Sequence, residues 1–218
     1  TNPTYEGVVS NVKAIADICK KYDVPLVVDE AHGCLWNFNK NLPESSLHLG
    51  ADAVVHSLHK TGGSMSQSSM LHITEGSKFD PDEIERTLQL LQTTSPSMLL
   101  MASLDAARAN LESKHGKKQL NRAIQHAKYV RKRLHKIEGV HVLEATENYN
   151  QDVTKVFVRV DGLSGKRLES ILEIDFDIEV ESASDIGVLL LINIGNTKQE
   201  IQYLVNAFEK IAHAQYSD

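Results

Sequence analysis

The chain has 218 residues, of which 41% are hydrophobic, and a formal net charge of −6. This length and composition allow a substantial buried core, in one large domain or two small ones. The negative charge argues against a nucleic-acid binder or a basic membrane-surface protein, because both need clusters of positive charge.

Cysteine usage and the start of the chain bear on where the protein works. Cys19 and Cys34 form no metal-ligand pattern, and two cysteines in a chain of this length favour a reducing compartment over a disulfide framework. There is no apolar run of the ~20 residues needed to span a membrane, and no signal peptide. We therefore predict a cytoplasmic protein without a metal site. Because the sequence opens at Thr1 without an initiator Met, we expect a fragment, a processed product or a separate subunit.

The first part of the chain alternates between helical and strand patterns. Apolar residues at helical spacing over residues 8–22 predict an amphipathic helix with lysines at its C-terminus. Strands are predicted at three short apolar runs: residues 25–29, 51–55 and 70–73. The first reads as buried on both faces. Such alternation favours a parallel sheet with crossover connections.

Further helices follow these strands. One is predicted to start at Pro81 with Asp80 as its N-cap. Two more are predicted over residues 97–113 and 117–137. The second carries a basic run at 128–136 that we interpret as a solvated helix face.

The pattern changes near Gly139, where strands predominate. Strands are predicted at residues 140–143, 153–160, 178–181 and 188–194, and helices at 165–174 and 197–213. This order suits a small α/β domain with helices on one side. We place the boundary between the two domains after residue 115, so that the second covers 116–218.

Two charged residues are predicted to meet at one edge of the sheet. Asp29 ends one predicted strand and Lys60 follows the end of the next, and ligands bind at the carboxyl ends of strands in open α/β sheets. A structural ion pair would explain the two residues on position alone. A lysine can also hold an aldehyde cofactor as a Schiff base, while a carboxylate keeps a pyridine nitrogen protonated.

The residues around Lys60 favour the cofactor interpretation. Ser57 and His59 precede Lys60, and a loop rich in glycine and serine follows it. Hydroxyls and exposed backbone N–H groups are what a phosphate needs near its binding lysine.

Four segments of the sequence resemble motifs of a known family, the ornithine/lysine/arginine decarboxylases. Residues 55–69 (VHSLHKTGGSMSQSS) resemble the attachment signature of that family for pyridoxal 5'-phosphate, and residues 28–32 (VDEAH) resemble its second motif. Residues 1–7 (TNPTYEG) and 93–105 (TTSPSMLLMASLD) are similar to two further segments, although Met98 replaces the usual aromatic residue. The resemblance covers residues 1–213 and has the right order and spacing.

The resemblance implies a fold and a set of roles. The fold would be that of the pyridoxal-phosphate-dependent transferases (aspartate-aminotransferase-like, fold type I): a partial large domain over 1–115, then a connecting helix and small α/β domain over 116–218. Lys60 would be the Schiff-base lysine and Asp29 would pair with the pyridinium nitrogen. Ala31 would pack on the ring face, while Ser57 and His59 would hold the phosphate.

Other polar residues have two interpretations each. His32 could approach the substrate and act in catalysis, although a single histidine is more often a packed polar residue. Thr94 and Ser95, with Ser97, could reach the phosphate of a neighbouring subunit or could cap a helix. We expect His56 and His72 merely to face polar neighbours.

The implied activity is decarboxylation of a basic amino acid, whether arginine, lysine or ornithine. The resemblance also implies that the first half of the cofactor domain is absent from this sequence. We therefore expect a homo-oligomer, or a complex with a chain that supplies the missing N-terminal part. The alternatives are a non-catalytic or regulatory paralogue or subunit, and an aminotransferase or lyase of the same fold.

Overall fold

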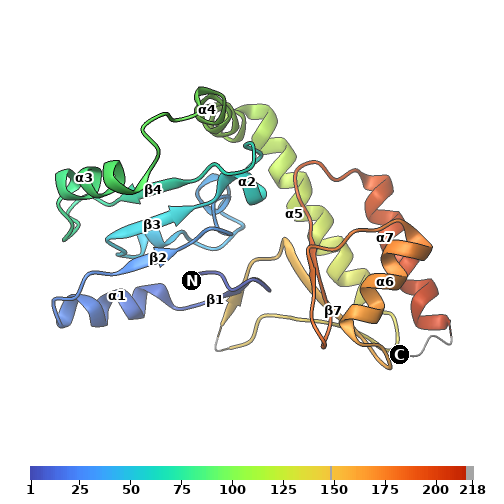
Figure 1. The fold of residues 1–218 in the computed structure, drawn as a ribbon. Helices are drawn as coiled ribbons and strands as arrows, with labels where there is room; N and C mark the ends of the chain where they lie inside the picture. The colour runs from blue at the N-terminus through green and yellow to red at the C-terminus, as the bar shows by residue number, and fades with distance from the viewer. Residues whose placement is uncertain (148, 215–218) are drawn as a thin grey trace. The chain divides into compact units, whose positions relative to one another are not determined.

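The computed structural model describes residues 1–147 and 149–214 (Figure 1). The chain divides into two compact units, Thr1–Lys117 and Lys118–Asp218. None of the described helices is both long and apolar enough to cross a membrane.

The first unit is built around a three-stranded sheet with the strand order β2-β3-β4. Its elements are β1 (Val8–Val9), α1 (Val12–Lys21), β2 (Val27–Asp29), β3 (Ala53–His56), α2 (Leu58–Thr61), β4 (Met70–Ile73), α3 (Pro81–Leu91) and α4 (Met98–Glu112), with short 3-10 turns at Trp36–Phe38 and Ser46–His48. Strands β2 and β3 are parallel, with Asp29 opposite Val55. The sequence prediction of a parallel pair is therefore confirmed.

The third predicted strand is present but runs the other way. Strand β4 pairs antiparallel with β3, with His56 opposite Met70. A parallel return needs a crossover of a dozen or more residues that crosses the sheet, usually as a helix. Residues 57–69 between β3 and β4 contain just the four-residue helix α2, which is too short to cross the sheet, and the chain reverses direction instead.

Two other predictions for this unit need correction. Residues 8–22 do not form one helix: β1 comes first, and α1 starts after Asn11, whose side chain accepts from the backbone N–H of Ala14. Strand β2 is not buried on both faces, because Val27 is 56% exposed while Val28 is buried. The helix that starts at Pro81 is confirmed, with the Asp80 side chain accepting from the N–H of Asp82.

The second unit packs helices against an antiparallel sheet with the strand order β5-β7-β9-β8. Its elements are α5 (Lys114–Leu134), most of which belongs to this unit, β5 (Val140–Val142), β6 (Asn150–Gln151), β7 (Lys155–Val160), α6 (Gly165–Phe176), β8 (Ser182–Ala183), β9 (Val188–Leu191) and α7 (Lys198–His213). The strand predicted at 178–181 is wrong in position, because the sheet pairing begins only at Ser182.

One basic residue of α5 departs from the solvated face that the sequence predicted. Arg131 is buried, and its guanidinium donates to the carbonyl oxygens of Leu143 (2.7 Å), Val153 (3.1 Å) and Lys155 (2.5 Å). Burial lowers the pKa of Arg131, and the nearby carboxylate of Glu144 opposes that shift. The planar guanidinium can satisfy several carbonyls at once, so it holds the segment before β7 against the helix.

The core of the second unit is apolar and continuous, and Phe208 of α7 lies fully inside it. We expect Phe208→Ala to destabilise this unit by about 3–5 kcal/mol, because the lost ring leaves a cavity that the surrounding side chains fill only in part. Chemical denaturation followed by circular dichroism measures the change. Tyr203→Ala on the same helix is the control, since that side chain is 50% exposed; equal losses for the two variants would contradict the assignment of the core.

Candidate functional site

The two charged residues singled out in the sequence lie at the carboxyl ends of neighbouring parallel strands. Asp29 is the last residue of β2, and Lys60 lies on α2, which begins two residues after β3 ends. Both side chains are exposed. Since β2 and β3 are parallel, these strand ends share one edge of the sheet, which is where open α/β sheets bind ligands.

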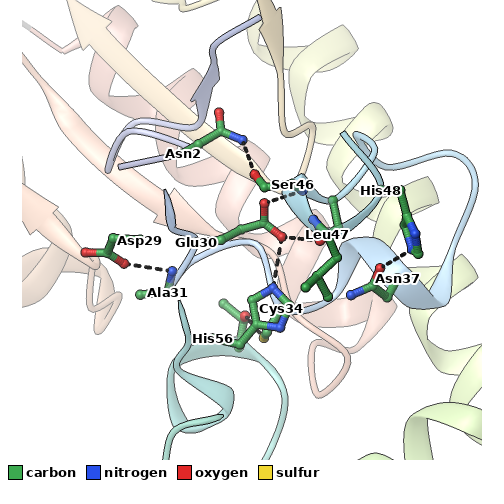
Figure 2. A network of polar contacts seen from close by, with 12 residues as sticks. Asn2, Asp29, Glu30, Ala31, Cys34, Asn37, Ser46, Leu47, His48 and His56 are labelled. Atoms are coloured by element: carbon green, nitrogen blue, oxygen red, sulfur yellow. Dashed lines mark hydrogen bonds and ion pairs between the residues drawn. The ribbon is translucent and has the colours of Figure 1, made fainter. Parts of the chain in front are cut away.

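Asp29 is fixed in place by a local hydrogen bond. Its Oδ1 accepts from the backbone N–H of Ala31 at 3.0 Å, which Figure 2 shows as a dashed line. Within the part of the chain that the structure describes, Oδ2 has no hydrogen-bond partner. One carboxylate oxygen therefore orients the side chain and the other can still accept from a ligand.

Lys60 contacts a histidine that follows the neighbouring strand. Its Nζ lies 3.1 Å from Nε2 of His32. His32 is 6% exposed, and its ring meets the ring of Tyr5 edge-on, with centroids 4.7 Å apart. The structure thus brings together Lys60 and His32, which lie 28 positions apart in the sequence. A proton can pass directly between two nitrogens at this distance.

The one-turn helix α2 orients the residues around Lys60. Ser57 immediately precedes this helix, and its side chain makes no capping hydrogen bond. The hydroxyl is therefore not used by the helix end. The backbone N–H of Lys60 donates to the carbonyl oxygen of Ser57 at 3.0 Å, which fixes the two residues relative to each other.

His59 makes a hydrogen bond that limits how it could hold a phosphate. Its Nδ1 lies 2.7 Å from the carbonyl oxygen of Ser68 and must donate to it, because a carbonyl only accepts. In the neutral ring Nε2 is then an acceptor, so His59 can donate to a phosphate from Nε2 only as an imidazolium. The same loop is closed by the hydroxyls of Ser64 and Ser68, 2.6 Å apart.

The segment with Thr94 and Ser95 lies between α3 and α4. All residues from 90 to 98 are exposed, and no hydrogen bond or ion pair joins them to Lys60 in the described residues. Ser97 caps α4, its side chain accepting from the N–H of Leu100 at 3.4 Å. The N-cap interpretation of Ser97 is therefore confirmed, whereas the N–H of Ser95 donates to the hydroxyl of Thr93.

Sequence reasoning missed Glu30, which stands between Asp29 and Ala31. It is fully buried and receives hydrogen bonds from Ser45, Ser46 and His56. A charged residue directly after an apolar strand was the available signal, but only the fold shows which donors meet it. His56 therefore does face a polar neighbour, as expected.

His72 lies beside His56, with the ring centroids 4.8 Å apart. Burial lowers the pKa of His72, His56 lowers it further, and Glu30 opposes the shift. Its Nε2 is buried without a hydrogen-bond partner in the described residues. We conclude that His72 is a neutral packed residue rather than a member of the site.

Solved structures with the same fold are lysine decarboxylases and related enzymes. The constitutive lysine decarboxylase of Escherichia coli superposes with a TM-score of 0.81 at 21% identity, over 98% of this chain and 36% of that one. The lysine decarboxylase LdcF of Francisella novicida gives a TM-score of 0.83 at 21% identity, over 98% and 35%. An alanine–glyoxylate aminotransferase of Nostoc matches with a TM-score of 0.65 at 18% identity, over 94% and 58%. The predicted aspartate-aminotransferase-like fold is therefore confirmed.

Similarity in sequence identifies the family. An arginine decarboxylase of Halalkalibacterium halodurans is 37% identical over 97% of this chain and 44% of its own length. An arginine decarboxylase of Bacillus subtilis is 38% identical over the same shares. This chain thus spans less than half the length of these relatives. The family model for the major domain of Orn/Lys/Arg decarboxylases matches residues 1–160, and the chain therefore belongs to the Orn/Lys/Arg decarboxylase family.

Proposed function

We propose that this chain is part of a pyridoxal 5'-phosphate-dependent decarboxylase of a basic amino acid, with Lys60 as the attachment residue. The observation that carries the proposal is the position of Lys60. Lys60 is exposed at the carboxyl edge of the sheet, and its Nζ lies 3.1 Å from His32 Nε2. The named relatives make arginine the first substrate to test, ahead of lysine and ornithine.

The residues at the sheet edge fit the proposed cofactor. The oriented carboxylate of Asp29 offers Oδ2 to a ring nitrogen, and Ala31, which is buried, would be the small apolar residue on the ring face. Ser57 has a hydroxyl that its own helix does not use, and His59 can add a charged donor. This set contains a nucleophilic amine, an anion for a pyridinium and donors for a phosphate.

Pyridoxal phosphate, when bound, supplies a ring that accepts the electrons left behind when the substrate carboxylate leaves as CO2. In this scheme Asp29 would hold the proton on the ring nitrogen, and Lys60 Nζ would be the attachment atom. Lys60 Nζ would also be the group placed to deliver a proton to the substrate Cα. His32 Nε2 is close enough to receive a proton from Lys60 Nζ or return one.

Two features support a need for further protein around this site. Within the described residues β2 and β4 each pair on one side only, and open sheet edges are normally paired or covered. Large apolar side chains flank Thr94 and Ser95: Leu91 is 79% exposed and Met98 is 73% exposed. We propose an assembly in which another polypeptide covers the exposed apolar side chains around Thr94 and Ser95. In that assembly Thr94 and Ser95 can approach a neighbouring subunit's phosphate.

Product analysis tests the proposed function. The protein is isolated with any polypeptide that accompanies it and is incubated with carboxyl-labelled arginine, lysine and ornithine in turn. We expect labelled CO2 and the matching amine, fastest from arginine. A keto acid without CO2 would instead identify an aminotransferase.

The same assay tests a regulatory role. Lys60→Ala is added to the comparison, because a regulatory subunit would stimulate decarboxylation by a partner whether or not Lys60 is present. Stimulation that survives this substitution would overturn the proposal.

A further inference from the structure

We propose that Glu30 is a positioning residue that holds the ends of β2 and β3 in register and so sets the geometry of the proposed cofactor site. It contacts no ligand itself and acts through its neighbours Asp29 and Ala31. The inference rests on the proposed function for its catalytic consequence, but its structural part can be measured separately.

The carboxylate of Glu30 is fully buried, and both of its oxygens are hydrogen-bonded. Oε1 accepts from the hydroxyl of Ser45 at 2.5 Å and faces Nε2 of His56 at 2.9 Å, while Oε2 accepts from the backbone N–H of Ser46 at 2.7 Å. A carboxylate is costly to bury unless donors surround it in this way. A shorter side chain at position 30 would leave several of these donors without an acceptor in the interior.

These contacts join the two segments that carry the site. Glu30 follows Asp29 directly, and His56 precedes Ser57 directly. The Glu30–His56 contact therefore links the segment that carries Asp29 to the segment that leads to Lys60. The backbone supports the same link: the N–H of Glu30 donates to Val55 at 3.0 Å, and the N–H of Ser57 donates to Ala31 at 3.3 Å. Figure 2 shows the side chains of Asp29 and Glu30 pointing in different directions.

The turn that carries His32 also packs on Glu30. The N–H of Gly33 donates to the carbonyl oxygen of Glu30 at 2.9 Å. A Cβ added at Gly33 would lie only 2.5 Å from Cγ of Glu30, so the turn is folded closely over this side chain. Glu30 therefore supports Asp29 on one side, His32 on the other and, through His56, the strand end that leads to Lys60.

The N-terminal segment is fastened to the same cluster. The N–H of Asn2 donates to the carbonyl oxygen of Asp29 at 2.8 Å, and its side-chain amide lies 3.5 Å from the hydroxyl of Ser46 (Figure 2). Asp29 is thus held by its own side chain, by the Asn2 contact to its backbone and by the buried Glu30 beside it.

The test compares substitutions that shorten or preserve the side chain. Glu30→Asp removes one methylene, so the carboxylate cannot reach Ser46 and His56 together. Glu30→Gln keeps the length, and its amide can donate to Ser45 and His56 while its oxygen accepts from Ser46. Asp52→Asn is the matched control, because Asp52 accepts from the N–H groups of Leu26 and Lys78 where β2 and β3 begin, away from the site.

Two readouts separate positioning from general stability, both made on the protein isolated with any polypeptide that accompanies it. Amide hydrogen exchange is measured over residues 29–33 and 56–61, and pyridoxal phosphate is titrated into cofactor-free protein by its visible absorbance. We expect Glu30→Asp to speed exchange in both segments and to weaken cofactor binding about tenfold or more. Glu30→Gln should restore both values to within a few-fold, and Asp52→Asn should leave them unchanged even if it lowers the melting temperature.

The outcomes that overturn the inference are distinct from those that overturn the proposed function. Unchanged exchange in Glu30→Asp, or equal changes in Asp52→Asn, would show that Glu30 contributes only general stability. Faster exchange in a protein whose unsubstituted form binds no cofactor would keep the structural role of Glu30 and reject the proposed function. If Glu30→Asp fails to fold, Ser45→Ala removes one hydrogen bond from Oε1, and it must change both readouts in the same direction for the inference to stand.

Discussion

Replacing Lys60 by alanine is expected to abolish covalent retention of pyridoxal phosphate and to lower decarboxylation by roughly 10³-fold or more, as for other residues that carry the covalent step. The methyl side chain of alanine cannot bind the aldehyde carbon. The substitution also removes the amine that lies 3.1 Å from His32 Nε2. Borohydride reduction followed by peptide mapping measures attachment, and CO2 release measures the rate.

The control for this experiment is Lys40→Ala, which removes another exposed lysine of the same unit. After borohydride reduction, the Lys40→Ala protein should still show the added mass of the cofactor on the peptide that contains Lys60. Its rate of CO2 release should be unchanged. Recovery of the cofactor on the same peptide in Lys60→Ala protein would mean that a different residue attaches it. Circular dichroism should show the same folded signal for both variants, because the Lys60 side chain is exposed.

Replacing Asp29 by asparagine is expected to lower kcat by roughly 10²–10³-fold, the range for losing one preorganised electrostatic contact to developing charge. Asparagine can still accept from the N–H of Ala31, so the local turn should persist. It cannot supply the negative charge that keeps a pyridine nitrogen protonated. The measurement is kcat and KM together with the thermal midpoint.

A specific pattern is expected from Asp29→Asn. The rate should fall while the thermal midpoint stays within a few degrees, since the side chain is exposed and its hydrogen bond is retained. A parallel fall in thermal midpoint would indicate a structural role for this carboxylate. An unchanged kcat would remove Asp29 from the proposed site.

Local sequence patterns were sufficient for most of the elements. Helical spacing and capping residues located α3, α4, α6 and α7, because helix hydrogen bonds and caps involve residues that are close in the chain. The motif around Lys60 also identified the candidate site, since Asp29 and Lys60 follow apolar runs that form adjacent strands. These features depend on residues that are near one another in sequence or on the order of the strands.

The tertiary structure decided the features that depend on distant partners. The direction of β4 followed from the connection after β3, whose helix α2 is too short to cross the sheet, and the burial of Arg131 followed from three carbonyl groups that no local pattern reveals. Glu30 could be recognised only when the fold brought Ser45, Ser46 and His56 around it. A buried charge is stabilised by hydrogen-bond partners from remote segments, so its sequence neighbours can mark its position but not the groups that meet it, whereas a helix or a cap is stabilised by the residues beside it.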